Sequence, residues 1–498
     1  MDTLQFSVEA LGHSSEFVSP ILVLLGVGLV LMLLDAFEVR SPLPWIAAAG
    51  LIGSSVLAWF VGSNESQLAF FGMMETGGIA PLVHIFLCMS ALFTLFFLQD
   101  YLGRQAKEIP DVYSLMIFAV IGMILLANAN DLIMSFIGLE TMSICLYIFA
   151  ALYKTDVRSN EAGLKYFLLG SFASTFLLFG ISIIYGITGY TNLTMLSSSA
   201  VADTLMTAGP IFYVACGLIL VGLLFKVSAF PFHMWTPDVY TGTPTPLTGL
   251  MSTGSKMAAF IALGVVMEKL NFVAHDKIVQ VIALSALFTM IYGNIVAARQ
   301  DNLKRMLAYS SVAHAGYVLL GLAAASIGFK AVLFYMFIYT LMNIGAFGMI
   351  GMAEKQFEDT NLDHWKGLGK RAPLFAGAMS VFLFSLAGIP PLAGFMSKYQ
   401  VFSSAIREDL IFLATIGILA SVIGAFYYIR VIVMMFFQEK GEDAPSFKLN
   451  YGSLPAVGIG ILVLLVILFG IFPSLVLEPI NTAFHGEAVN ASVTALGN

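Results

Sequence analysis

The sequence predicts an all-α integral membrane protein. Of its 498 residues, 59% are hydrophobic and only 11% are charged, whereas a soluble domain has about 25% charged residues. The hydrophobic residues form uninterrupted blocks of about twenty, the length of helix that crosses a hydrocarbon layer about 30 Å thick. A soluble fold could not bury so much apolar surface, so the lipid bilayer is the solvent of this chain.

About fourteen blocks of spanning length follow one another, and we expect each to form a transmembrane helix. They cover residues 18–36, 45–62, 81–99, 110–127, 130–152, 162–188, 208–232, 244–267, 277–297, 303–322, 328–352, 373–403, 410–436 and 453–475. The first seventeen residues contain no Lys or Arg. They therefore lack the positive region of a cleavable signal peptide, and we expect the first block to be retained.

Positive charge alternates between the loops. Fourteen of the 23 Lys and Arg residues fall in or beside odd-numbered loops, and only four fall in or beside even-numbered loops. Cytoplasmic loops collect Lys and Arg. We therefore expect the odd-numbered loops on the cytoplasmic side and both termini on the opposite side.

Two of the blocks contain related, proline-interrupted sequences. Residues 225–231 read Phe-Lys-Val-Ser-Ala-Phe-Pro, and residues 384–390 read Phe-Ser-Leu-Ala-Gly-Ile-Pro. They lie in blocks seven and twelve, five spans apart, so the copies run in opposite directions, as in transporters with inverted repeats. Pro231 and the pair Pro390-Pro391 each remove a backbone donor, which predicts that both helices are broken there.

A few ionisable residues lie deep inside the blocks, at staggered depths. Glu140 and Lys256 fall about 15 and 18 Å into blocks five and eight, near the bilayer midplane, with Lys226 and Lys398 on either side. A charge at the midplane costs about 2.5–3.5 kcal/mol, so these groups must face protein or water. A buried lysine can release its proton, and a nearby carboxylate such as Glu140 beside Lys226 would restore it. The pattern indicates a path for protons or cations; a purely structural Glu–Lys pair is the alternative.

Other polar residues in the blocks are open to a structural interpretation. His314 either relays protons between Lys256 and Lys398 or packs structurally. Lys165 has Glu161 four residues earlier, which favours an interfacial ion pair. Arg430 can reach the headgroups as an anchor.

Two further sites carry histidine. His84 lies outside the repeated blocks and is interpreted as structural. His233, Trp235 and Asp238 follow block seven in a loop without Lys or Arg. This cluster forms either a proton entrance or, as we favour, a cap on the broken helix.

The sequence lacks the patterns of redox, nucleotide and zinc sites. Cys88, Cys145 and Cys216 occur singly, with no C-x-x-C pair. There is no G-x-G-x-x-G after a strand, no P-loop and no H-E-x-x-H. No basic run indicates nucleic-acid binding. We expect no cofactor or metal on this chain, so any redox group must belong to another subunit.

Long motifs lie at residues 225–240, 243–246, 252–256, 304–314 and 388–398. Together they resemble one known family, subunit N of bacterial NADH:quinone oxidoreductase, respiratory complex I. The related subunits L and M typically read Leu-Pro-Asp-Ala where residues 236–239 read Thr-Pro-Asp-Val, and M typically has glutamate in place of Lys398. Both differences favour subunit N.

The resemblance implies a domain organisation. It places three helices in residues 1–109, a first five-helix bundle in residues 110–269 and a second, inverted bundle in residues 270–436. Residues 437–498 would hold a cytoplasmic loop, helix fourteen and a tail. The chain would thus be a proton-translocating subunit of a translocase, coupling quinone reduction in other subunits to proton transfer across the bacterial inner membrane.

The resemblance also implies roles and partners. Glu140 and Lys226 would form the paired switch, Lys256 the central relay and Lys398 the group that exchanges with the outer side, while Lys165 matches a lysine found in the family. The partners would be the antiporter-like subunits L and M, small membrane subunits and lipid. FMN, iron–sulfur clusters and quinone would lie in partner subunits. An Mrp-type Na⁺/H⁺ antiporter subunit and a silent scaffold are the alternative functions.

Overall fold

The computed structural model describes residues 2–62, 66–104, 109, 111–270, 276–357, 359–439 and 452–484. Residues 440–451 and 485–498, which the sequence assigns to a loop and the tail, lie outside these residues. In chain order the larger helices are α1 (Asp2–Ala36), α2 (Leu43–Val61), α3 (Ala80–Arg104), α4 (Asp111–Ala127), α5 (Leu132–Ala150), α6 (Val157–Thr188), α9 (Pro210–Lys226), α11 (Thr245–Lys269), α12 (Asp276–Ala298), α13 (Leu303–Ala323), α14 (Ala325–Phe357), α16 (Pro373–Ala387), α17 (Ala393–Arg407), α18 (Ile411–Phe437) and α19 (Ser453–Ile471).

Short elements connect these helices. They are the antiparallel strands β1 (Leu68–Ala69) and β2 (Met74–Glu75), the helices α7 (Leu193–Leu196), α8 (Ser199–Thr207), α10 (Thr236–Gly242) and α15 (Leu368–Arg371), and the 3₁₀ turn η2 (Leu362–Trp365). Two of them, α7 and η2, begin with a side-chain cap; Asn192 accepts a hydrogen bond from the backbone N–H of Met195 at the start of α7.

Eleven helices of the described chain are long and apolar enough to cross a membrane, or twelve if the bent pair α8 and α9 counts as one span. The shorter apolar helices α4 and α16 occupy two more of the predicted blocks. The all-helical membrane fold is therefore confirmed. The count of fourteen spans stays a prediction, as does the inverted relation between the two bundles.

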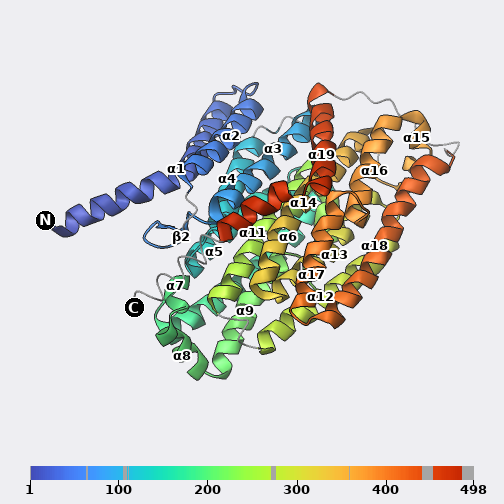
Figure 1. Ribbon diagram of the computed structural model, residues 1–498. Helices are drawn as coiled ribbons and strands as arrows, with labels where there is room; N and C mark the ends of the chain where they lie inside the picture. Colours follow the sequence, from blue (N-terminus) through green and yellow to red (C-terminus); the bar gives the residue numbers. More distant parts are fainter. Residues whose placement is uncertain are drawn as a thin grey trace.

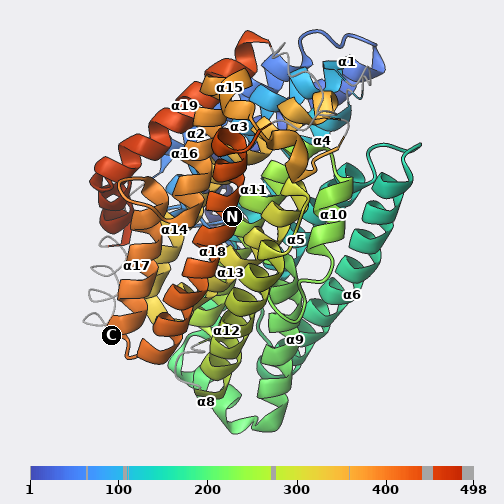
Figure 2. The ribbon, with the colours of Figure 1, turned by 90° about the vertical axis from the view of Figure 1, so that its right-hand side faces the viewer.

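The helices form an elongated bundle, with α1 and α2 at one edge (Figures 1 and 2). Three helices, α11, α13 and α14, run through its interior. In their most apolar 18-residue stretches, 94%, 89% and 100% of the residues are buried, whereas the corresponding values are 28% for α1 and 22% for α19. A helix that is buried all round cannot direct a charged side chain to solvent or lipid. Polar groups within these buried stretches must therefore find partners inside the protein.

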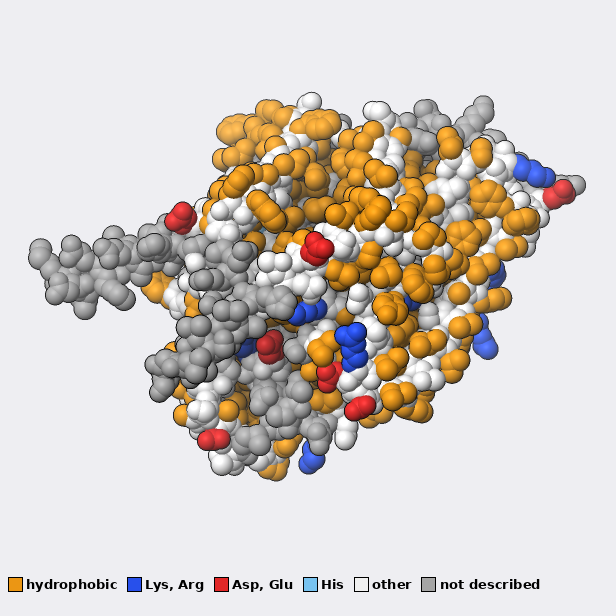
Figure 3. Space-filling model, in the orientation of Figure 1, with side chains coloured by type: hydrophobic (Ala, Val, Ile, Leu, Met, Phe, Trp, Pro, Cys, Tyr) orange, Lys and Arg blue, Asp and Glu red, His pale blue; other side chains and the backbone are white. Residues whose placement is uncertain are grey.

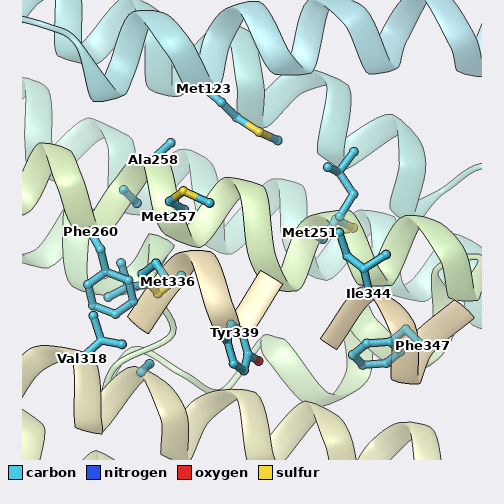
Figure 4. Packing of buried hydrophobic residues seen from close by; sticks show 14 of the residues in the cluster. Met123, Met251, Met257, Ala258, Phe260, Val318, Met336, Tyr339, Ile344 and Phe347 are labelled. Carbon is cyan, nitrogen blue, oxygen red and sulfur yellow. The ribbon is translucent and has the colours of Figure 1, made fainter. Parts of the chain in front are cut away.

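The interior is packed with flexible and aromatic side chains. Figure 4 shows Met251, Met257 and Phe260 of α11 packed among residues of neighbouring helices, including Met336 and Phe347 of α14. All five are at most 1% exposed. Methionine adapts to irregular gaps between helices, so this packing leaves little free space around the polar side chains.

The outer surface is apolar. Hydrophobic side chains cover most of the face in Figure 3, and charged side chains are few and scattered. On α6, Phe167, Phe172 and Phe179 are 51%, 67% and 57% exposed, and α18 presents Leu419 and Phe426 in the same way. Exposed apolar surface of this extent is what a lipid-facing helix requires.

Both predicted helix breaks are present. Helix α9 ends at Lys226, and the chain is not helical again until α10. Helix α16 ends at Ala387, and α17 begins at Ala393. The first break begins directly after Lys226 and not at Pro231, so the predicted position of this break is corrected. The reason is that a proline ring clashes with the carbonyl four residues earlier, which here is that of Val227.

Candidate proton-transfer site

Lys226 occupies the last position of α9 and is 2% exposed. Its Nζ donates hydrogen bonds to the Ser143 hydroxyl of α5 at 2.9 Å and to the Tyr166 hydroxyl of α6 at 3.0 Å. The amine also lies 5.1 Å from the centre of the Tyr166 ring, within the range of a cation–π contact. Two neutral hydroxyls therefore hold this lysine.

Glu140 lies on α5, three residues before Ser143 and so on the same face of the helix. Its Oε1 is buried and has no hydrogen-bond partner among the described residues. No ion pair joins it to Lys226 in the described chain, although the two groups are close enough to interact electrostatically. The structure thus brings the predicted pair together without direct contact.

Lys256 lies in the middle of α11 and is 1% exposed. Its Nζ donates to the backbone oxygen of Ser311 at 3.0 Å and to the Ser311 hydroxyl at 2.7 Å. The Tyr240 ring centre is 5.9 Å away. Groups on α13 and α10 therefore surround this amine.

One face of α13 leads from Lys256 toward Lys398. Ser311, His314 and Tyr317 are spaced by three residues and so share a face. His314 Nδ1 lies 2.7 Å from the Tyr335 hydroxyl, and its Nε2 lies 3.1 Å from the Tyr428 hydroxyl. Both ring nitrogens therefore have partners that can donate or accept a proton.

Lys398 lies on α17 and contacts the second helix break. Its Nζ donates to the backbone oxygen of Ala387, the last residue of α16, at 2.9 Å, and to the Ser421 hydroxyl of α18 at 2.9 Å. The amine also lies 5.3 Å from the centre of the Tyr317 ring. Tyr317 thus links the face of α13 that carries His314 to Lys398.

Lys165 is different because it is 40% exposed. Its Nζ pairs with Glu161 at 2.6 Å, as the sequence predicts, and also with Asp238 of α10 at 2.8 Å. Arg305 of α13 pairs with the other oxygen of Asp238 at 2.9 Å. Partial burial favours the neutral acid, but the hydrogen bonds from Lys165 and Arg305 outweigh it and lower the pKa of Asp238.

The cluster after α9 caps the broken helix. Trp235 donates from Nε1 to the backbone oxygen of Phe225 at 3.1 Å and stacks on Tyr166 with ring centres 4.4 Å apart. His233 is buried, and its Nδ1 has no partner among the described residues. The tryptophan contacts favour the cap over the proton entrance.

Two other predictions concern positions away from the lysines. His84 Nε2 lies 2.7 Å from the Ser54 hydroxyl, which agrees with a structural role. Arg430 pairs with the exposed carboxylate of Asp301 at 2.8 Å, as suits an anchor near the membrane surface. The three cysteines are buried and form no disulfide. Among the described residues, no three His, Cys, Asp or Glu side chains gather as a metal site would require.

Sequence reasoning missed the hydroxyl groups that hold the lysines. Ser143, Tyr166, Ser311 and Ser421 are common residue types, so composition gives no reason to select them. Position along the helix gives a weak signal, because Ser143 follows Glu140 by three residues and Ser311 precedes His314 by three. Which hydroxyl meets which amine depends on helix packing across the bundle.

Comparison with known proteins identifies the family. Residues 129–424 match the family described as NADH:quinone oxidoreductase/Mrp antiporter, TM. NADH-quinone oxidoreductase subunit N 1 of Chloroherpeton thalassium is 40% identical over 472 residues, which cover 93% of this chain and 96% of that protein. The chain belongs to the subunit N family of NADH-quinone oxidoreductases. The predicted resemblance is therefore confirmed.

Solved structures agree with this assignment. A chain of respiratory complex I from Thermus thermophilus with bound aureothin has 30% identity and a TM-score of 0.77, covering 92% of this chain and 98% of that one. A chain of the Mrp complex from Dietzia sp. DQ12-45-1b has a TM-score of 0.83 at 22% identity, covering 94% of this chain and 96% of that one. At that identity the second likeness concerns the fold alone.

Proposed function

We propose that this member of the subunit N family translocates protons across the membrane, as the antiporter-like subunit of an NADH:quinone oxidoreductase. One observation carries the proposal. Lys226, Lys256 and Lys398 are all buried, and each amine is bound by hydroxyl or backbone oxygen atoms instead of a carboxylate. A lysine kept only for structure would be paired with an acid, since an unpaired buried charge is costly.

Hydroxyl partners suit an amine that changes its protonation state. A protonated amine donates to Ser311 or Ser143, and a neutral amine can accept a hydrogen bond from the same hydroxyl. Movement of Glu140 toward Lys226 stabilises the protonated amine, and movement away from it releases the proton toward Lys256. From there His314 and Tyr317 lead to Lys398, which exchanges the proton with the outer side.

Lys165 has a different role in this proposal. Its two carboxylate partners keep it charged, so it holds α10 against α6 within the first bundle. The bundles correspond to residues 110–269 and 270–436. FMN, iron–sulfur clusters and quinone belong to partner subunits, and L-type, M-type and small membrane subunits surround the chain in the bacterial inner membrane.

Both termini lie on the periplasmic side in this proposal, on the evidence of the loop charges. Impermeant labelling of a cysteine placed at residue 495, in cells stripped of their outer barrier, tests it. Protection of that cysteine would reverse the orientation.

The test of function is substitution of Lys256 in the assembled complex, reconstituted in sealed vesicles. Lys256→Arg keeps a cation that does not deprotonate in proteins, so we expect proton pumping to fall while assembly is retained. Lys256→Ala should reduce it further. Quinone reduction and vesicle acidification are measured together, and full pumping by both variants would overturn the proposal.

An Mrp-type Na⁺/H⁺ antiporter subunit is the second candidate, favoured only by the shared fold. Copurification separates the two functions. Flavin and iron–sulfur subunits should accompany this chain if it belongs to the oxidoreductase, and their consistent absence would favour the antiporter.

A further inference from the structure

An ion pair between a buried lysine and a partly exposed glutamate lies outside the lysine series described above. Lys304, near the start of α13, is 3% exposed at its side chain, and its Nζ lies 3.5 Å from Oε1 of Glu354 on α14. Glu354 is 22% exposed and so reaches solvent at one edge. Its other oxygen accepts hydrogen bonds from Thr245 at 2.6 Å and Tyr101 at 3.2 Å.

The position of this pair is informative. Glu354, Lys304, Thr245 and Tyr101 come from α14, α13, α11 and α3, and each lies at the helix end that the loop charges assign to the cytoplasm. Two of the helices, α11 and α13, carry Lys256 and His314 deeper in the bundle. A partly exposed carboxylate at this point can take a proton from cytoplasmic water.

A line of buried polar groups leads inward from the pair. Lys304 Nζ donates to the backbone oxygen of Thr243 at 2.7 Å, and the Thr248 hydroxyl lies 3.4 Å from the same oxygen. Ser252 follows Thr248 by four residues, one turn or about 6 Å along α11. Thr243, Thr248 and Ser252 are at most 1% exposed.

The line continues to Lys256 through α14. Asn343 Nδ2 donates to the Ser252 hydroxyl at 2.7 Å and to the Tyr339 hydroxyl at 2.9 Å. Tyr339, which Figure 4 shows beside α11, also interacts through its hydroxyl with Ser311, the residue that holds Lys256. The polar line therefore reaches the central lysine without passing Glu140 or Lys226.

One atom on this line lacks a partner. Oδ1 of Asn343 is buried and has no hydrogen-bond partner among the described residues. A buried amide oxygen left unsatisfied costs about 1–3 kcal/mol. A water molecule bound there would satisfy it and would bridge Ser252 and Tyr339.

From these contacts we infer that Glu354 and Lys304 form a second cytoplasmic inlet, which delivers protons to Lys256 between α11, α13 and α14. The Glu354 carboxylate takes a proton from water, and Lys304 stabilises the carboxylate again once that proton has moved inward. The hydroxyls of Thr248, Ser252 and Tyr339, together with water bound between them, carry the proton inward, and each accepts one proton as it releases another. The Thr243 carbonyl and the Asn343 amide only hold this line in place, and the neutral amine of Lys256 receives the proton. This inference rests on the proposed proton-translocating function.

The experiment compares Glu354 variants of the assembled complex in sealed vesicles. Glu354→Gln keeps the shape and hydrogen-bonding capacity but cannot carry a proton, so we expect acidification to fall severalfold relative to quinone reduction. Glu354→Asp should retain most pumping. Asp301→Asn, which removes an exposed carboxylate from an ion pair on the same predicted side, is the matched control and should pump normally.

A rescue measurement separates proton uptake from structure. In Glu354→Ala vesicles, formate, a weak acid that carries protons, should restore pumping, and nitrate, which has the same charge but does not titrate, should not. Equal rescue by both anions would show that Glu354 supplies only a structural charge. That result, or rescue by neither anion, would overturn the inlet. Full pumping by Glu354→Gln would overturn it as well.

Pumping by Glu354→Gln is compared with pumping by Lys256→Ala. If that variant pumps fully, the proposed function itself fails. If Lys256→Ala does not pump but Glu354→Gln does, only the inlet is wrong.

Discussion

The two broken helices use their lysines differently. At the first break, Lys226 binds hydroxyls of α5 and α6, and other side chains satisfy the unwound backbone. At the second break, Lys398 itself donates to the free carbonyl of Ala387. In the proposed mechanism the first lysine therefore serves proton transfer alone, whereas the second amine also binds the end of its broken helix.

The backbone requirements of the breaks differ as well. The second break depends on glycine: Gly388 has φ of +87°, and a Cβ at Gly394 would lie 1.8 Å from the backbone oxygen of Ser385. The first break contains no glycine between Lys226 and Trp235. There, Ser285 and Thr289 of α12 bind the backbone of Phe230 instead. One break is closed by tight backbone packing, and the other is closed by side chains from a neighbouring helix.

The largest expected effect is on stability, from Gly394→Ala. The added Cβ meets a backbone oxygen, which cannot move aside as a flexible side chain can, so we expect a loss of about 1–3 kcal/mol or more. Heat-induced loss of the assembled complex measures it. Gly377→Ala in α16 is the control, because nothing lies within 4 Å of its Cβ position. Equal thermal stability of the two variants would show that the second break is not closely packed.

The next effect separates the two lysines. Lys226→Met and Lys398→Met should both reduce proton pumping in vesicles. Lys398→Met should also destabilise the complex more than Lys226→Met does, because the carbonyl of Ala387 loses its donor at a cost of about 1–3 kcal/mol. Ser143 keeps its own hydrogen bond to the backbone oxygen of Leu139 in the Lys226 variant. Similar thermal midpoints for both variants would contradict the division of roles.

The sequence predicted much of this arrangement, for physical reasons that differ between residues. Lysine and proline inside apolar blocks are costly, so Lys226, Lys256 and Pro231 stand out without any structure. Ser311 and Tyr166 do not stand out, since serine and tyrosine can be placed inside apolar helices at little cost in free energy. Their importance depends on helix rotation and packing between distant segments. The same holds for the ends of the breaks, which depend on where an unwound carbonyl finds a donor.

Lys304 illustrates the limit most clearly. Its place in a basic loop beside Arg305 predicts a topological anchor in the headgroup region. The structure buries it against Glu354, fifty residues away in the sequence. Loop charge is counted along the chain, whereas burial depends on how α13 and α14 pack. The positive charge of this loop, which predicts topology, therefore gave no indication of the ion pair between Lys304 and Glu354.

The smallest expected effect tests whether the first break is itself part of the proton path. Thr289→Val removes the hydroxyl that accepts the N–H of Phe230 at 2.8 Å, at a cost of about 0.5–1.5 kcal/mol. We expect a small decrease in thermal stability and unchanged pumping per quinone reduced, because Lys226 donates its hydrogen bonds to α5 and α6 and not to α12. Ser171→Ala on the exposed face of α6 serves as the control. Suppose instead that Thr289→Val impairs pumping as strongly as Lys226→Met, with the complex still assembled. The unwound backbone of the first break would then take part in proton transfer, and the two breaks would be more alike than their contacts indicate.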